Sequence, residues 1–256
     1  MIFLIGGNGL VGSAFVRYFS SNKIKFKNIQ RQNYKKFIGK KCDLLIYANG
    51  NNNKTFAQKD PIYDFETTVS STMNYICNIK FKKIIYFSSV DFYSNTKSSK
   101  FTNEDFNEPI KNKNNYGFNK FLAEACVSKY CKNYIIFRLG GLVGPNLKKN
   151  PIYDLIYKKK IFTSFNSIMN FIHTDFVADI VMKIEKNKKT KNQIFNLCSK
   201  NSIKIKNIIK KYKLKDIKVE KKFNIVQKYN INCKKITKLI SLPTSTESIN
   251  KYYFNI

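Results

Sequence analysis

The chain has 256 residues and a formal net charge of +31, carried by 47 basic and 16 acidic residues. Only three of the basic residues are arginines and the lysines are spread over the whole chain, which indicates a solvated surface with weak, nonspecific affinity for nucleic acid. No apolar run is long enough to span a bilayer, so we expect no membrane span. The six cysteines show no CxxC spacing and the chain has one histidine, so we expect neither a disulfide framework nor a metal site.

The apolar pattern alternates between short continuous runs and helical spacing. It predicts strands at 2–5, 24–30, within 42–50, 82–89, 133–141 and 194–198, and helices at 12–21, 64–79, 115–130 and 171–186, the last entered through a short extended piece. This alternation is typical of a parallel sheet covered on both faces, so we expect an α/β fold, a Rossmann-type doubly wound parallel sheet. Because Met1 stands almost directly before the first strand, without a basic region, no signal peptide is expected and the protein is predicted to be cytoplasmic.

Three glycines lie between the first predicted strand and helix, in MIFLIGGNGLVGSAF. Gly6 permits a tight turn, Gly9 lets a pyrophosphate approach the backbone, and Gly12 lets the helix pack closely on the strand. The start of the helix, with Leu10 and Val11, would face the phosphates. The pattern favours a dinucleotide-binding loop, and the alternative is an ordinary strand-to-helix turn.

The end of the second predicted strand bears on the choice of cofactor. Dinucleotide folds often place a carboxylate there to bind the adenosine ribose, but this chain has Gln30 followed by Arg31. An arginine suits a 2′-phosphate, so NADP is modestly favoured over NAD. The alternative is that Arg31 is simply solvated.

Several further segments are similar to those of one protein family. They are FSSVDFY at 87–93, YGFNK at 116–120, RLGGLVGP at 138–145 and FIHTDFVA at 171–178. With the glycine loop, they resemble the extended short-chain dehydrogenase/reductase family of nucleotide-sugar epimerases, dehydratases and reductases, over roughly residues 1–200.

This resemblance implies how the chain is organised. An NAD(P)-binding Rossmann domain would comprise 1–145 and 171–200, and a small substrate-binding cap would comprise 146–170 and 201–256. The lysine-rich tail keeps apolar spacing, as in SIKIKNIIKKY, which fits a small helical and extended cap. The resemblance also implies a homodimer formed through helices such as 64–79 and 115–130.

The resemblance further implies a catalytic set of Ser89, Tyr116 and Lys120. Tyr116 would be the general acid or base for a sugar oxygen, and the Lys120 cation would lower the pKa of its phenol. Lys120 would also bind the nicotinamide ribose, and Ser89 would hold the substrate oxygen. The alternative for Ser89 is a strand-end cap.

A second tyrosine–lysine pair with the same spacing is Tyr93 and Lys97. Such pairs arise by chance in a chain rich in both residues. Tyr116 and Lys120 lie on one face of a predicted helix, whereas Tyr93 and Lys97 lie in a polar loop, so the former pair is favoured.

Other residues are predicted around this set by their place in the pattern. Ala48, Asn49 and Gly50 end the third strand and are expected to contact the cofactor. Asp91, Arg138 and Gly141 are expected, with Ser89, near the substrate. Gly141 stands where the family often has asparagine, so one polar contact is expected to be missing.

The sequence therefore predicts an NAD(P)-dependent oxidoreductase or epimerase that acts on a sugar, expected to be nucleotide-linked, at a hydroxyl or keto carbon. The alternative is a cofactor-binding sensor or scaffold without turnover. A dehydratase is less favoured, because Asp91 stands where the family's dehydratases have glutamate. His173 is expected to be structural, where the cap meets the core.

Overall fold

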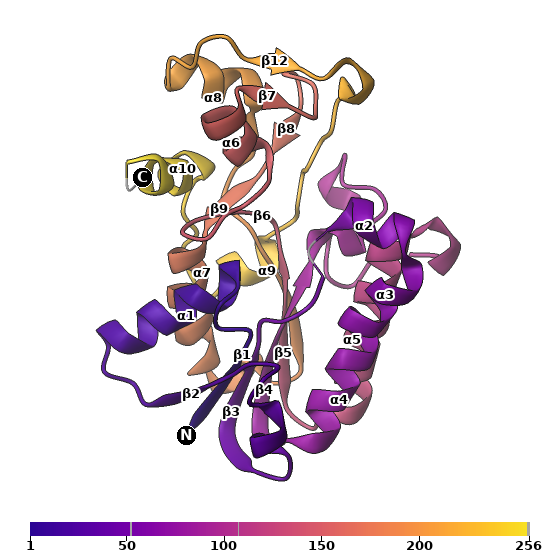
Figure 1. The fold of residues 1–256 in the computed structure, drawn as a ribbon, viewed down its shortest axis with the longest axis vertical. Coiled ribbons are helices and arrows are strands. Elements are labelled where there is room, and N and C mark those ends of the chain that lie inside the picture. The colour runs from indigo at the N-terminus through magenta and orange to yellow at the C-terminus, as the bar shows by residue number, and fades with distance from the viewer. Residues whose placement is uncertain (52, 107, 255–256) are drawn as a thin grey trace.

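The computed structural model describes residues 1–51, 53–106 and 108–254, and a parallel six-stranded sheet forms its centre (Figure 1). In order across the sheet the strands are β10 (Gln193–Leu197), β5 (Tyr134–Leu139), β4 (Lys80–Ser89), β3 (Lys41–Tyr47), β1 (Ile2–Ile5) and β2 (Phe26–Ile29). Every neighbouring pair is parallel. The chain runs from β1 to β2 at one edge and returns to the other side of β1 with β3, which creates a switch point beside β1.

Helices cover both faces of the sheet (Figure 1). One face carries α1 (Leu10–Ser21), α7 (Thr174–Glu185) and the short α9 (Lys234–Thr237). The other carries α4 (Ser71–Asn78) and α5 (Asn115–Tyr130), preceded by α2 (Lys54–Lys59) and α3 (Pro61–Phe65). The expected doubly wound α/β fold is confirmed.

The alternation of side chains along β4 divides the apolar core between the two faces. Ile85 and Phe87 belong to the cluster under α1 and α7, whereas Ile84 and Tyr86 belong to the cluster under α4 and α5. All four are buried. Strands buried on both faces read as continuous apolar runs, which is why KKIIYFSS could be recognised.

The segments at 146–170 and 201–256 contribute several small elements beyond the carboxyl end of the sheet (Figure 1). These are α6 (Pro151–Tyr153), β7 (Lys160–Ile161), β8 (Ile168–Met169), β11 (Ile203–Lys204), α8 (Ile205–Lys211), β12 (Lys218–Val219) and α10 (Ser245–Tyr253). They share a third apolar cluster that includes Ile152, Leu155 and Ile208. Between this cluster and the sheet, β6 (Gly141–Val143) pairs in parallel with β9 (Phe171–His173).

Two predicted boundaries differ from the structure for local reasons. The first helix begins at Leu10 and not at position 12, because Gly9 already takes the N-cap place. The strand predicted at 133–141 ends at Leu139, and Gly141 starts β6, which pairs with β9 outside the main sheet. The short extended piece expected before the last helix is confirmed as β9.

The helix predicted at 64–79 forms as three successive pieces. Pro61 starts α3, with the Asp60 side chain accepting a hydrogen bond from the Tyr63 amide, a normal helix start. A π-helical turn at Glu66–Ser70 then joins α3 to α4. Such turns change which side chains face inward, and they are frequent at functional sites.

The glycine loop depends on a very close approach between α1 and the end of β1. A Cβ at position 12 would lie 2.1 Å from the carbonyl oxygen of Gly6, a separation that no side chain can occupy. Gly6 itself has φ +82°, the left-handed region that glycine adopts without strain. Glycine is therefore required at both positions by the fold.

We predict that Gly12→Ala lowers the free energy of unfolding by about 1–3 kcal/mol, because its methyl group overpacks the contact with Gly6. Gly9→Ala is the matched control, since its Cβ would meet only the Gly6 oxygen, at 3.3 Å. Its loss should stay within about 1 kcal/mol. Urea denaturation measures both, and equal losses would contradict this account of the loop.

Candidate active site

The start of α1 offers backbone donors at the carboxyl end of β1. Gly9 is the N-cap and makes no side-chain cap hydrogen bond, so the first amide groups of the helix are not capped by it. Uncapped amides at a helix start attract anionic groups such as phosphate. Leu10 and Val11 are half-buried and pack against the neighbouring apolar clusters. A glycine loop without side chains, next to the first amides of a helix, fits the pyrophosphate of a dinucleotide.

A hollow of about 200 Å³ lies on the same edge of the sheet. It is lined by Arg31, Asn49, Gly50, Asn51, Tyr63 and Thr67. Ala48 lies against the loop, because a Cβ on Gly6 would be 2.7 Å from the Ala48 carbonyl oxygen. The structure therefore brings the predicted cofactor residues from the ends of β1, β2 and β3 to one place.

The first turn of α5 packs on the turn that follows β4, and this contact brings the candidate triad together. Asn114 caps α5 by accepting a hydrogen bond from the Gly117 amide at 2.8 Å. A Cβ on Gly117 would lie 2.4 Å from the Asp91 carbonyl oxygen, so only glycine fits. Tyr116 directly precedes Gly117 and therefore lies beside the end of β4, near enough for the Ser89 hydroxyl to influence the pKa of its phenol.

Lys120 follows Tyr116 by one helical turn and lies on the same side of α5. Its Nζ is 5.2 Å from the centroid of the Tyr116 ring and would be 3.3 Å from a Cβ on Gly50. Both side chains are buried. Lys120 therefore lies between the candidate acid–base residue and the loop that ends β3.

Burial shifts the pKa values of both residues. It raises the pKa of Tyr116 well above its usual value, and the Asp91 charge raises it further, so the lowering by Lys120 that was expected from the sequence is not found. Burial lowers the pKa of Lys120 to about 8, against the opposing influence of Asp64, Glu124 and Asp91. Tyr116 is thus a protonated phenol at neutral pH, ready to donate a proton.

Asp91 belongs to a polar cluster that contains Ser89 and two residues that were not predicted from the sequence. Its carboxylate accepts from the Ser89 hydroxyl at 3.2 Å and from the Tyr229 hydroxyl at 3.0 Å, and it forms an ion pair with Lys54. Lys54 comes from α2 and Tyr229 from the C-terminal segment, so three distant stretches meet here. No motif in the sequence marks Lys54 or Tyr229, because only the tertiary fold brings them to Asp91.

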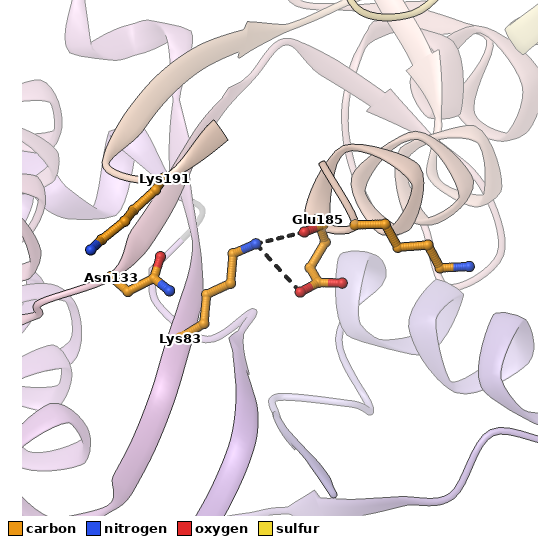
Figure 2. Close-up of a pocket in the computed structure, with 5 residues that line it drawn as sticks. Lys83, Asn133, Glu185 and Lys191 are labelled. Atoms are coloured by element: carbon orange, nitrogen blue, oxygen red, sulfur yellow. Dashed lines mark hydrogen bonds and ion pairs between the residues drawn. The ribbon is translucent and has the colours of Figure 1, made fainter. Parts of the chain in front are cut away.

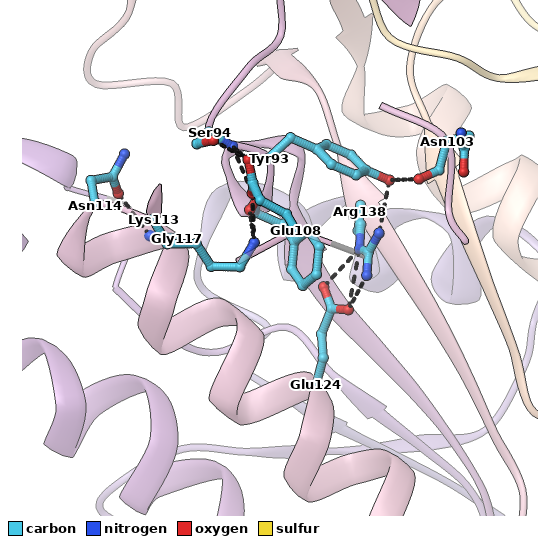
Figure 3. Close-up of polar contacts among 10 residues, drawn as sticks. Tyr93, Ser94, Asn103, Glu108, Lys113, Asn114, Gly117, Glu124 and Arg138 are labelled. Carbon is cyan, nitrogen blue, oxygen red and sulfur yellow. Dashed lines mark hydrogen bonds and ion pairs between the residues drawn. The ribbon is translucent and has the colours of Figure 1, made fainter. Parts of the chain in front are cut away.

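Arg138 occupies a place different from the one the sequence suggested. Figure 3 shows its guanidinium in a buried cluster, where it donates two hydrogen bonds to Glu124 through Nε and one through Nη2, and a fourth to the Tyr93 hydroxyl. Its side chain is 3% exposed. All the charge of Arg138 is thus used to tie β5 to α5, and a substrate contact forms no part of the proposal below.

The tyrosine of the second tyrosine–lysine pair belongs to the same cluster. The Tyr93 hydroxyl accepts from Arg138, as Figure 3 shows. It also donates to the side chain of Asn196 at 3.0 Å, so it is a core group. Nearby, Lys113 and Glu108 form an ion pair of 2.8 Å. Tyr93 therefore supports the loop after β4, away from Tyr116.

Gly141 and His173 are explained by packing. A Cβ on Gly141 would lie 2.5 Å from the Asn170 carbonyl oxygen, so the asparagine of related sequences cannot fit here without a shift. His173 is buried, and its Nδ1 accepts from the Asp175 amide at the start of α7. Burial lowers the pKa of His173 to about 4, which keeps it neutral and suits a structural cap.

A larger hollow, of about 410 Å³, lies at the opposite end of the sheet (Figure 2). It is lined by Lys83, Asn133, Glu185, Lys186 and Lys191, and Lys83 donates to the Glu185 carbonyl oxygen at 2.6 Å. In doubly wound sheets ligands bind beyond the carboxyl ends of the strands. We therefore place the candidate site at the smaller hollow, beside the glycine loop.

Two negative findings apply to residues 1–51, 53–106 and 108–254. No helix there is both long and apolar enough to cross a membrane. No cluster of three or more histidine, cysteine, aspartate or glutamate side chains is arranged to hold a metal ion.

The glycine loop at the switch point and the serine, tyrosine and lysine beside it define a Rossmann-type protein with the arrangement of the short-chain dehydrogenases and reductases. Residues 2–198 match the NAD dependent epimerase/dehydratase family, and the chain belongs to that family. The resemblance seen in the sequence is thereby confirmed. No curated protein sequence matches the chain.

Solved structures with the same fold have low sequence identity to this chain. Pal from Bacillus thuringiensis is 16% identical, with a TM-score of 0.78 over 99% of each chain. RMD from Pseudomonas aeruginosa, solved with NADPH, is 14% identical, with a TM-score of 0.77 over 100% of this chain and 99% of that one. UDP-glucuronic acid 4-epimerase from Bacillus cereus, solved with UDP-glucuronic acid and NAD, is 16% identical, with a TM-score of 0.78 over 99% and 98%.

We predict that Arg138→Met destabilises the protein by about 3–5 kcal/mol, because it leaves the Glu124 carboxylate buried without a counter-charge. Adding Glu124→Gln should recover a large part of that loss. Urea denaturation of the two single variants and the double variant measures this coupling. Additive losses would show that the two side chains do not act as a pair.

Proposed function

We propose that the protein is an NAD(P)-dependent oxidoreductase or epimerase that acts on a nucleotide-linked sugar at a hydroxyl or keto carbon. The observation that carries the proposal is that Ser89, Tyr116 and Lys120 lie together, with Lys120 against Gly50 in the loop after β3, in a member of this family. The nicotinamide cofactor, when bound, would supply or accept the hydride. The family and the fold both support NAD(P) use.

The side chains of this chain would handle the proton and the substrate oxygen. Ser89 would hold that oxygen by a hydrogen bond, and Tyr116 would donate its phenolic proton to it during reduction or remove a proton during oxidation. A buried Lys120 ammonium would stabilise the phenolate that remains. Because the pKa of Tyr116 is raised, its resting state is the acid, which is the form that reduction requires.

The cofactor proposed for this reductive direction is NADP. Arg31 lines the hollow at the ends of β2 and β3, together with Asn49 and Gly50. Its guanidinium could form a bidentate contact with a 2′-phosphate. NAD remains the cofactor of choice for an epimerase, which keeps its cofactor bound and needs no external reductant.

The dehydratase alternative is less favoured by the contacts of Asp91. An elimination acid must be free to give its proton to the leaving hydroxyl, but this carboxylate is bonded to Ser89, Tyr229 and Lys54. The sensor alternative keeps the fold and the cofactor but predicts no turnover. In both enzyme forms we propose that 146–170 and 201–256 act as the substrate-binding cap and that the protein works in the cytoplasm.

We predict that NADPH binds more tightly than NADH and that Arg31→Ala weakens NADPH binding by roughly 10- to 100-fold while leaving NADH unchanged. The estimate corresponds to the loss of a hydrogen-bonded contact between two charges. Nicotinamide fluorescence measures both affinities after any co-purified nucleotide has been identified. A preference for NADH, or retained NAD, would move the proposal to an epimerase.

We predict that Tyr116→Phe lowers kcat by about 10²- to 10⁴-fold, because the general acid is lost, and leaves NADPH binding intact. UDP- and dTDP-linked 4-keto hexoses, tested with NADPH, are the first substrates. Tyr93→Phe is the matched control, since Tyr93 lies in the buried cluster with Arg138. An unchanged rate in Tyr116→Phe would refute the assignment of the acid, and cofactor binding without turnover by the unaltered protein would favour the sensor.

A further inference from the structure

Asp64 is a fully buried carboxylate that the proposed reaction does not use. It lies in α3 and is 0% exposed. It accepts hydrogen bonds from the side chains of Asn51 at 2.7 Å, Asn119 at 2.8 Å and Thr68 at 3.4 Å. An ionised carboxylate is an acceptor only, so three surrounding donors suit its charged form.

Two of the residues that donate to Asp64 stand, in the sequence, directly next to Lys120 or to a residue that Lys120 approaches. Asn119 directly precedes Lys120 in α5. Asn51 directly follows Gly50, whose Cβ position is 3.3 Å from the Lys120 Nζ. The carboxylate and the ammonium are therefore buried between the same two segments, the loop after β3 and the first turns of α5.

The other charges that face Lys120 are already paired. Glu124, on the next turn of α5, is bonded to Arg138, and Asp91, after β4, is paired with Lys54. Tyr116, on the preceding turn, is a neutral phenol at neutral pH. Within the described part of the chain Asp64 forms no direct ion pair with any basic side chain, Lys120 included, so its charge acts on Lys120 at longer range.

We propose that Asp64 is the counter-ion of Lys120 and a positioning residue for it, holding the ammonium charged between the cofactor loop and α5. The proposal rests on the proposed role of Lys120 in the reaction. Two opposite charges attract strongly where water is excluded, and a buried ammonium without a counter-charge would lose its proton. Burial lowers the pKa of Lys120, and among the nearby charges that raise it again Asp64 has the largest effect.

The proposal has a consequence for stability that needs no substrate. The pKa of Lys120 is about 8 in the folded protein and 10.5 as the reference value. Between these values the unfolded chain binds more protons, so this group makes stability rise as pH increases through that window. Removing the Asp64 charge should lower the folded pKa of Lys120 further, so that the rise begins at lower pH.

The test compares Asp64→Asn with the unaltered protein by urea denaturation between pH 6 and pH 10. We expect Asp64→Asn to be destabilising at pH 6, with the loss shrinking at higher pH and the rise in stability starting about one pH unit earlier. In a Lys120→Met background this pH dependence should vanish. Thr68→Val, which removes one donor and keeps the charge, should cost the same stability at every pH.

A destabilisation by Asp64→Asn that is independent of pH, or that persists unchanged in the Lys120→Met background, would overturn the proposal. If Asp64→Asn alone does not fold, the Asp64→Asn/Lys120→Met double variant is compared with Lys120→Met. The double variant should be the more stable of the two, because it no longer buries a carboxylate without a counter-charge. No gain in that comparison would also overturn it. If the coupling depends on pH but the protein turns over none of the 4-keto sugars, the result supports the electrostatic coupling of Asp64 and Lys120 and rejects the proposed function alone.

Discussion

The contact between the first turn of α5 and the turn after β4 is the constraint on which the candidate site depends. The helix approaches the Asp91 backbone so closely that only glycine fits at position 117. This approach sets the distance between the end of β4 and Tyr116, and therefore whether Ser89 and the phenol can share one substrate oxygen. Further along the same helix, Glu124 is held by Arg138 from β5, so both ends of the segment that carries Lys120 are fixed.

Burial of charge is the second theme of the site, and each buried carboxylate has a different partner. Glu124 is neutralised by an arginine fork and Asp91 by an ion pair with Lys54, whereas Asp64 accepts hydrogen bonds from two asparagine amides and a threonine hydroxyl. Buried charges are tolerated only when they are paired or well hydrogen-bonded. This arrangement leaves Lys120 as a buried cation whose protonation responds to its surroundings, beside a tyrosine kept in its acid form.

The C-terminal segment contributes directly to this environment. Tyr229 reaches Asp91, and the backbone of Asn230 donates to the Thr96 carbonyl oxygen in the loop after β4. The small elements beyond the sheet are thus tied to the same loop that follows Ser89. A movement of that segment would therefore change the contacts of Asp91 and, through its charge, the electrostatics around Tyr116.

The sequence by itself determined the order of the strands and helices along the chain and the glycine turn between β1 and α1, and it favoured Tyr116 over Tyr93. These features are local: they depend on apolar runs, on helical spacing and on glycines at positions 6 and 12 that the close approach of α1 to β1 requires. The tertiary structure alone decided the place of Arg138, which the sequence pattern put near the substrate and which packs instead against Glu124. It alone brought Lys54, Asp64 and Tyr229 to the site. Those side chains carry no local signal, because a lysine, an aspartate or a tyrosine in a polar stretch looks the same whether it is solvated or paired. Only the packing of distant segments determines which of them is buried beside a charge.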